Sequence, residues 1–212
     1  MANISANKEP IDLSNTKTVR EIARSYSARE HIMDVAQIFA MTRGVNSFSY
    51  KDIANEVGIK TPSIHYHFPK KEDLAAALMD RYLDRFHRVL NEFDQTISDP
   101  KEKLRAYVNS CVDCTDNALQ VCLCGMMASD FLTLSEKAQK CVQEFIDFNE
   151  KWIEKVLKDG KKSGDLDFQV SYVQAARLIF GLIEGCIITA HAFPEEERIA
   201  GLSNNVLKLV SA

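Results

Sequence analysis

Apolar residues recur at helical spacing along most of this chain. In the segment from about 28 to 42, Ile32, Val35 and Phe39 fall on one face of a helix, and Gly44 follows as a stop signal. Three more helices are predicted after it, at about 49–57, 62–67 and 71–97. The apolar residues of the longest one keep to a single stripe, which is typical of a helix packed on one side.

A strong helix-start signal divides the second half of the chain from the first. Asp99 suits an N-cap, Pro100 the first helical turn and Glu102 the third position of a capping box. The remaining helices are predicted at about 100–117, 121–134, 136–163, 170–192 and 195–210, with a hinge at Pro194. Because no segment alternates like a strand, the pattern predicts an all-α fold of about nine helices.

Charge is distributed unevenly along the 212 residues. The formal net charge is −4, which argues against a protein coated in basic surface. Residues 17–71 nevertheless hold nine basic and five acidic residues, whereas residues 75–212 hold 16 basic and 21 acidic ones. The basic excess therefore lies near the N-terminal end, where a local footprint on DNA would need it.

The chain shows no sequence feature of export or membrane insertion. The first 28 residues are polar and lack the apolar run of a signal peptide. The most apolar stretch, residues 178–190, is interrupted by Glu184 and is too short to span a bilayer. We therefore expect a cytoplasmic protein whose six cysteines are reduced.

Residues 49–68 have the pattern of a helix-turn-helix. Two short helices that cross steeply need a small residue in the first, a turn residue able to take a positive φ, and a branched apolar anchor in the second. Ala54, Gly58 and Ile64 supply these three at suitable spacing. Thr61 is a candidate cap of the second helix, with Pro62 in its first turn. These residues explain folding and carry no information about DNA.

The polar residues left over around the second helix are candidates for contact with phosphates and base edges, because they carry hydroxyl, imidazole or ammonium donors. They are Lys60, Thr61, Ser63, His65, Tyr66 and His67. His67 could equally be a core residue. The basic residues of the N-terminal tail, Lys17, Arg20 and Arg24, could contact phosphates as a mobile arm or simply be solvated.

The whole stretch from residue 29 to residue 74 resembles the DNA-binding region of the TetR/AcrR repressors. The resemblance is specific because the helix-turn-helix is followed by His67-Phe68-Pro69-Lys70-Lys71-Glu72-Asp73-Leu74. It implies a tail over residues 1–25, a three-helix DNA-binding domain over 26–72, and a helical effector-binding and dimerisation domain over 73–212. It also implies a repressor that leaves a palindromic operator when a small-molecule effector binds.

The resemblance also assigns roles to single residues. Ser49, Tyr50 and Lys51 open the helix that lies against the DNA backbone. Lys71 caps the start of the next helix and contacts a phosphate. His65 stands where the family usually has tyrosine, with Tyr66 one position later, so its DNA contact is less secure than that of Tyr66 or Lys71.

The effector half offers weaker signals. Candidate walls of a ligand cavity are the aromatic and methionine residues Tyr107, Met126, Met127, Phe131, Phe148 and Trp152, each of which could instead be ordinary core. Gly181 and Gly185, four residues apart in a very apolar helix with Ile188, would let a second helix approach closely. They predict a homodimer interface, the alternative being a central helix of a monomer.

Six cysteines leave three possibilities open. Cys122 lies where a helix should begin, which would lower its thiol pKa, and the segment from Cys122 through Cys124 to Ala128 resembles one branch of the TetR/AcrR repressors. A thiol-switched repressor is thus an alternative to a ligand-released one, although small buried hydrophobes are the commoner fate of free thiols. A metal site is disfavoured because Cys122 and Cys124 would point about 200° apart on a helix.

An enzyme is the competing class of function. Cys111 and Cys114 have the spacing of a thiol oxidoreductase, but that chemistry normally accompanies a βαβ unit, and no strand pattern is present. We therefore expect a regulator without catalytic residues and without a cofactor. Its expected partners are double-stranded operator DNA, an unidentified effector and a second copy of the chain.

Overall fold

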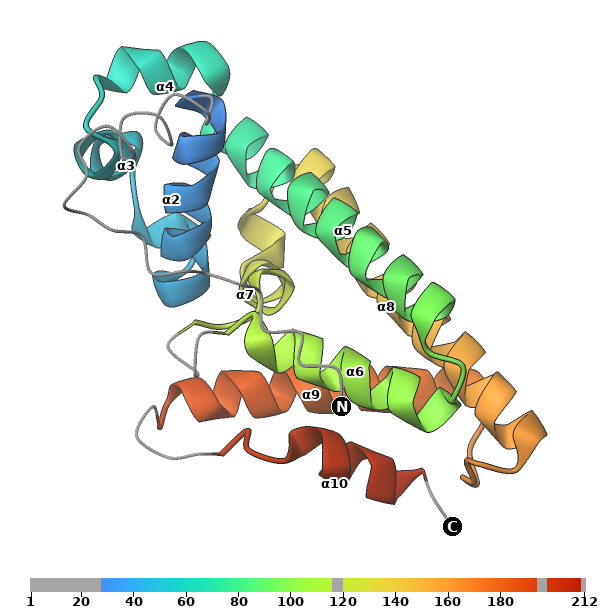
Figure 1. The fold of residues 1–212 in the computed structure, drawn as a ribbon. Coiled ribbons are helices and arrows are strands. Elements are labelled where there is room, and N and C mark those ends of the chain that lie inside the picture. The colour runs from blue at the N-terminus through green and yellow to red at the C-terminus, as the bar shows by residue number, and fades with distance from the viewer. Residues whose placement is uncertain (1–27, 116–119, 194–197, 211–212) are drawn as a thin grey trace, which may run out of the picture.

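The structure is a computed structural model that describes residues 28–115, 120–193 and 198–210. Within these residues the chain forms nine α-helices and two short 3-10 helices, and no strand. Figure 1 shows a small head built from α2, α3 and α4, joined to a larger helical body. The all-α expectation is confirmed. The N-terminal tail and the hinge expected at Pro194 lie outside the described residues.

The head is a three-helix unit around one apolar centre. It consists of α2 (Ala28–Arg43), the 3-10 helix η1 (Val45–Ser47), α3 (Tyr50–Val57) and α4 (Thr61–His67). Ile32, Ile53 and Ile64, one from each helix, are completely buried. Because α3 and α4 are too short to be stable alone, this shared burial holds the unit together.

The body is a layered bundle in which long helices lie side by side. Its elements are α5 (Lys71–Thr96), α6 (Pro100–Asp113), α7 (Leu123–Ser129), η2 (Phe131–Thr133), α8 (Glu136–Ser163), α9 (Tyr172–His191) and α10 (Leu202–Leu209). α8 packs along both α5 and α9, and α10 covers α6 (Figure 1). α7 is wedged between the body and α2, so it touches both parts of the molecule.

Several helices are shorter than their sequence pattern predicts. α6 ends at Asp113 rather than near residue 117, and α7 covers only part of the segment 121–134. The backbone just before α7 is diverted because the Val121 amide donates to the carbonyl of Met41 at 2.8 Å. That contact ties the body to the last turn of α2, and local propensity could not reveal it.

Two predicted capping roles are wrong and one is confirmed. Asp99 caps α6, with its carboxylate accepting from the Lys101 and Glu102 amides. Thr61 is the first residue of α4, not its cap, because the chain is still extended at Lys60. Likewise α5 is preceded by Lys70 as N-cap, and Lys71 is its first helical residue.

α9 is longer than the apolar stretch seen in the sequence. Its 20 residues are apolar and long enough to cross a membrane by length and composition alone. In the structure Ile179, Ile183 and Ile187 are buried against the rest of the body, while Leu178 and Leu182 face outward. The helix is therefore a core element with one unpartnered apolar face, and its length by itself is weak evidence for a membrane.

Candidate nucleic-acid interface and ligand cavity

The turn between α3 and α4 has the predicted geometry. Gly58 adopts a left-handed conformation with φ of 75°, and its amide donates to the Ala54 carbonyl at 3.0 Å. Ala54 is 4% exposed and Ile64 is fully buried. A side chain at Gly58 would meet no neighbouring atom, so the requirement for glycine is one of backbone conformation.

The start of α3 is fixed by a reciprocal pair. Ser49 caps the helix by accepting from the Asp52 amide, and the Ser49 amide and hydroxyl both donate to the Asp52 carboxylate at 2.7 Å. These hydrogen bonds hold the pKa of Asp52 below its usual range. The Ser49 side chain is therefore engaged within the chain while remaining at the surface.

Tyr50 lies inside the head. Only 8% of the residue is exposed, and its hydroxyl donates to the Phe68 carbonyl at 2.9 Å. The His65 ring packs edge-on against it, with 4.8 Å between ring centroids. Burial, and to a smaller extent the negative charge of Asp73, raises the pKa of the Tyr50 phenol above its usual value. This placement favours a positioning role over the direct contact that the sequence suggested.

The outward side of α4 carries polar groups that the head does not use. Lys60 and Ser63 are exposed, Thr61 is half-buried, and Tyr66 is 84% exposed. His67 is half-buried beside Tyr66, with 5.1 Å between the two rings. Such a row can donate to phosphates and base edges. His65 is also exposed, but its Nδ1 lies 3.3 Å from the Pro69 carbonyl, so one ring nitrogen is occupied.

Lys71 is tied into the head rather than standing free. Its ammonium donates to the Phe48 carbonyl and lies 4.5 Å from the centre of the Phe48 ring. Burial lowers the pKa of this ammonium, opposed by the negative charge of Asp52. The side chain therefore fastens the start of α5 to the loop before α3. Lys51, in contrast, is exposed on α3.

A small cavity lies in the middle of the body. It contains about 210 Å³ of space unfilled by protein atoms, counting its mouth, and its free centre holds roughly one water molecule. It is lined by Tyr82, Phe86, Tyr107, Cys111, Cys122, Phe145, Phe180 and Glu184.

Of the six predicted ligand residues, only Tyr107 lines this cavity. Trp152 stacks on Tyr107 from behind with 5.5 Å between centroids, and Phe148 packs on the His87 ring at 3.8 Å. Met127 is buried in α7, Met126 lies against Gly44 of the head, and Phe131 is half-buried in η2.

Glu184 is the residue that sequence reasoning missed. It is half-buried as a whole, but its Oε2 is fully buried and has no hydrogen-bond partner in the described chain. Burial raises the pKa of this carboxyl to about 7, opposed by a contact with the Cys122 thiol. The signal in the sequence is a single glutamate inside the most apolar helix, where its charge argues only against a membrane span.

Four of the six cysteines, among them both candidates for a thiol switch, do not have the environment of reactive thiols. Cys122 does precede the first residue of α7, as predicted, but it is buried. Burial, followed by the charge of Glu184, raises the pKa of Cys122 and Cys124 well above the usual thiol value. The loss of solvent around the thiol, which raises its pKa, outweighs the lowering effect of the α7 N-terminus. Burial likewise raises the pKa of Cys111 and Cys114.

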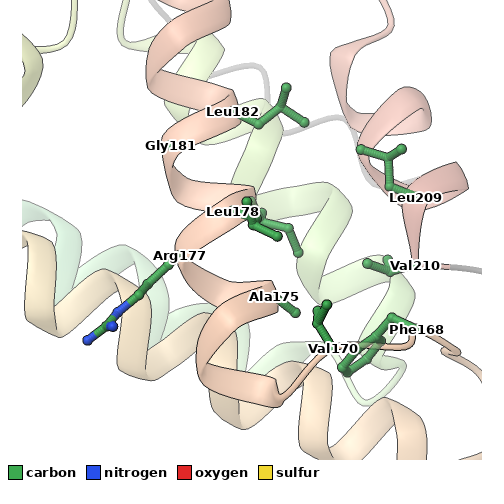
Figure 2. Close-up of a pocket in the computed structure, with 10 residues that line it drawn as sticks. Phe168, Val170, Ala175, Arg177, Leu178, Gly181, Leu182, Leu209 and Val210 are labelled. Atoms are coloured by element: carbon green, nitrogen blue, oxygen red, sulfur yellow. The ribbon is translucent and has the colours of Figure 1, made fainter.

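An apolar groove lies at the surface between α9 and α10. Figure 2 shows Leu178 and Leu182 of α9 facing Leu209 and Val210 at the end of α10. Leu178 is 64% and Leu209 65% exposed, which is unusual for leucines on neighbouring elements. Gly181 lines this groove, and Gly185 and Ile188 are exposed farther along α9.

Several known proteins with a similar sequence or fold are transcriptional regulators. Residues 32–78 match the family described as bacterial regulatory proteins, tetR family. The fold is similar to a TetR transcriptional regulator from Legionella pneumophila, with TM-score 0.79 and 30% identity, covering 88% of this chain and 98% of that chain. A TetR-family regulator from Agrobacterium tumefaciens gives TM-score 0.81 and 30% identity, covering 87% and 97%. The transcriptional repressor KstR2 from Rhodococcus jostii is 23% identical over 147 residues, which is 68% of this chain and 72% of that protein.

Proposed function

The chain belongs to the TetR family and is a DNA-binding transcriptional repressor, and we propose that it grips a palindromic operator as a homodimer until a small-molecule effector releases it. The observation that carries this proposal is the difference between the two sides of α4. One side of this helix is anchored by the completely buried Ile64, whereas the other presents polar side chains that the head leaves unused. A head over residues 26–72 would bind DNA, and the body over 73–212 would bind the effector and the second protomer.

Within the head we divide the contacts by chemistry. Ser63 and Tyr66, together with Thr61, would reach base edges in the major groove. Lys60 and Lys51 would bind phosphates. His67 stands beside Tyr66 and could contribute, whereas His65, Ser49, Tyr50 and Lys71 are engaged within the head and would act mainly by positioning it.

The groove between α9 and α10 supports the homodimer. A two-fold dimer uses the same patch on both protomers, so an apolar face of this kind can cover its own copy. The absence of Cβ atoms at Gly181 and Gly185 would let the two α9 helices approach closely, and Ile188 would continue the contact. Two heads would then reach successive major grooves of cytoplasmic DNA.

Two connections could carry a signal from the body to the head. α7 packs against α2, and Val121, just before α7, donates its amide to the Met41 carbonyl of α2. Arg81 of α5 binds the Asp34 carboxylate of α2 at 2.7 Å and the Gln37 amide oxygen at 2.8 Å. An effector that shifts α7 relative to α5 would therefore change the angle of α2. Because the two heads must match two half-sites, a change in their separation weakens the DNA-bound state.

The proposal is tested by selecting bound sequences from random DNA with the purified full-length protein, then footprinting the selected site. We expect a two-fold symmetric sequence, a changed base preference for Ser63→Ala, and a sequence-independent loss with a smaller salt slope for Lys60→Ala. Lys140→Ala, at an exposed lysine of α8, is the matched control. Failure to select any sequence at low salt would contradict the assignment.

A further inference from the structure

The buried carboxyl of Glu184 occupies space that is free because residue 125 is a glycine. On α7, a Cβ added to Gly125 would come within 2.6 Å of Oε2 of Glu184. The missing side chain thus leaves room for the carboxyl between α9 and α7. Oε2 has no donor within the described residues, although an unpartnered buried carboxyl oxygen is costly. The Cys122 thiol contacts the carboxyl, but the Oε2 atom itself is left without a donor.

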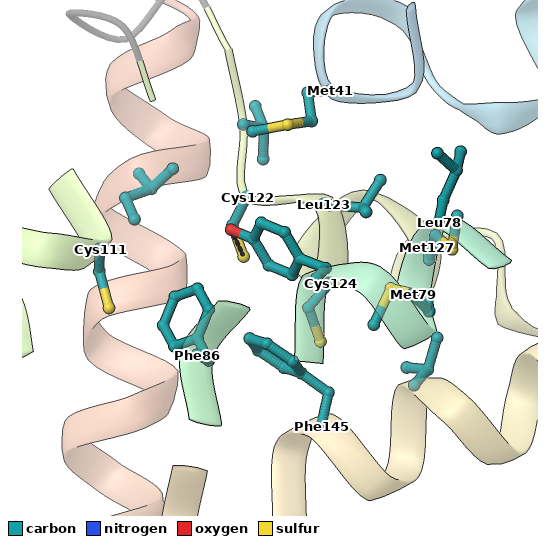
Figure 3. Close-up of a cluster of buried hydrophobic side chains, with 14 of the residues drawn as sticks. Met41, Leu78, Met79, Phe86, Cys111, Cys122, Leu123, Cys124, Met127 and Phe145 are labelled. Atoms are coloured by element: carbon teal, nitrogen blue, oxygen red, sulfur yellow. Dashed lines mark hydrogen bonds between the residues drawn. The ribbon is translucent and has the colours of Figure 1, made fainter. Parts of the chain in front are cut away.

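The walls around this carboxyl are aromatic and contain no positive charge. Tyr82 stacks with Phe145 at 5.2 Å between centroids, and Phe86 packs edge-on against Phe145 at 4.9 Å. Figure 3 shows Phe86 and Phe145 converging with Cys111 and Cys122 from four parts of the chain. No lysine, arginine or histidine is among the residues that line the cavity.

The Tyr107 hydroxyl in the cavity wall also favours a donor ligand. The Tyr107 hydroxyl uses its proton to bond the Asn149 amide oxygen at 3.0 Å, which leaves its oxygen available as an acceptor. A carboxylate ligand would face Glu184 without compensation. A ligand with N–H donors and a positive charge satisfies the carboxyl, the phenol oxygen and the aromatic faces together.

We propose that the cavity around Glu184 binds a small protonated amine with an apolar body, which donates to Oε2 of Glu184 and packs against the aromatic walls. This inference rests on the proposed function only in taking such an amine as the effector that releases DNA. Burial raises the pKa of Glu184, and a bound cation would draw the carboxyl back to its charged form.

The position of the cavity connects binding to the head. Its free centre holds only about one water molecule, so an amine with an apolar body fits only if the walls separate. Cys122, the N-cap of α7, lines the cavity, and Gly125 of α7 lies against the Glu184 carboxyl. Moving them carries Val121, whose amide is bonded to Met41 in the last turn of α2. Binding therefore displaces the element that touches the head.

The test measures ligand binding without DNA, using the fluorescence of Trp152, the only tryptophan in the chain, which stacks on Tyr107. Full-length protein is titrated with benzylamine, with the uncharged benzyl alcohol of similar shape, and with benzoate. We expect benzylamine to bind at least tenfold more tightly than either. Removing one charge-assisted hydrogen bond should weaken benzylamine about 10- to 100-fold in Glu184→Gln and leave benzyl alcohol within about twofold.

Two further variants separate a local effect from a general one. Glu144→Gln makes the same chemical change at an exposed carboxylate of α8 and should bind benzylamine like the unaltered protein. Gly125→Ala keeps the carboxyl but fills the space beside it, so it should weaken benzylamine too. Equal affinity for the amine and the alcohol, or an unchanged amine affinity in Glu184→Gln, would overturn the proposal.

A second arm adds benzylamine to the complex with selected operator DNA. Release of the DNA at the benzylamine concentration that saturates the Trp152 fluorescence change supports the amine as effector. Binding without release would leave the amine site standing and refute its regulatory role. A protein that selects no DNA at all would refute the proposed function, while the fluorescence titration would still decide the amine site.

Discussion

Replacing Glu184 by glutamine should stabilise the folded protein at pH 8 and change it little at pH 5. The pKa of this carboxyl is raised from 4.5 to about 7 because burial disfavours its charged form. Between these two values the folded state holds a proton that the unfolded state has lost. Stability therefore falls as pH rises through this window, and above about 7 the full cost of a buried charge is present.

The size of the effect follows from the same pKa difference. At about 1.4 kcal/mol per pKa unit, the difference between 4.5 and about 7 sets an upper bound of roughly 3–4 kcal/mol. Glutamine has nearly the shape of the acid and never ionises, so Glu184→Gln should recover most of this at pH 8. For a chain of this length, 3 kcal/mol corresponds to roughly 6–12 °C in Tm.

Urea unfolding at pH 5 and pH 8, at one fixed protein concentration, measures this difference. Fixing the concentration matters because dimerisation contributes to apparent stability. Glu144→Gln on the exposed side of α8 is the control and should change neither midpoint appreciably. A Glu184→Gln midpoint that moves equally at both pH values, or falls at pH 8, would show that the carboxyl is not a buried charge at neutral pH.

Three further changes test other parts of the structure. Gly58→Ala should destabilise the head by about 1 kcal/mol in thermal unfolding, because φ is 75° there and no clash adds to the strain; an unchanged Tm would refute the conformational requirement. Lys71→Met should cost about 1–2 kcal/mol in urea by leaving the Phe48 carbonyl without its donor, yet keep the salt slope of DNA binding; a slope lowered by one would restore Lys71 as a phosphate contact. Leu178→Glu in the groove should yield monomers in sedimentation velocity and lose operator affinity, whereas Leu132→Glu, at a residue 92% exposed on η2, should not; a dimeric Leu178→Glu protein would place the interface elsewhere.

The sequence determined the head because its information is local. Ala54, Gly58 and Ile64 lie within eleven residues, and each acts through a helix face or a turn that follows from spacing alone. The helix pattern and the Asp99 cap were predictable for the same reason, since a side chain that bonds to an amide two or three residues later needs no distant partner.

Only the tertiary structure decided which polar groups are already buried or hydrogen-bonded within the chain. Lys71 and Tyr50 carry donors that suit DNA, but carbonyls 23 and 18 residues away already accept from them. Cys122 stands at a helix start, as the sequence predicts, yet burial raises its pKa instead of lowering it. In each case a desolvation or a long-range hydrogen bond outweighs the local signal, and neither can be read from spacing.

Glu184 shows the same limit most clearly. In the sequence it is one charge in an apolar helix and argues only against a membrane span. Its meaning depends on Gly125 and on aromatic residues of α5, α6 and α8, which are brought together by helix packing. Periodicity determines which face of a helix is apolar, but packing between helices decides what a buried carboxyl faces, and therefore what the cavity can bind.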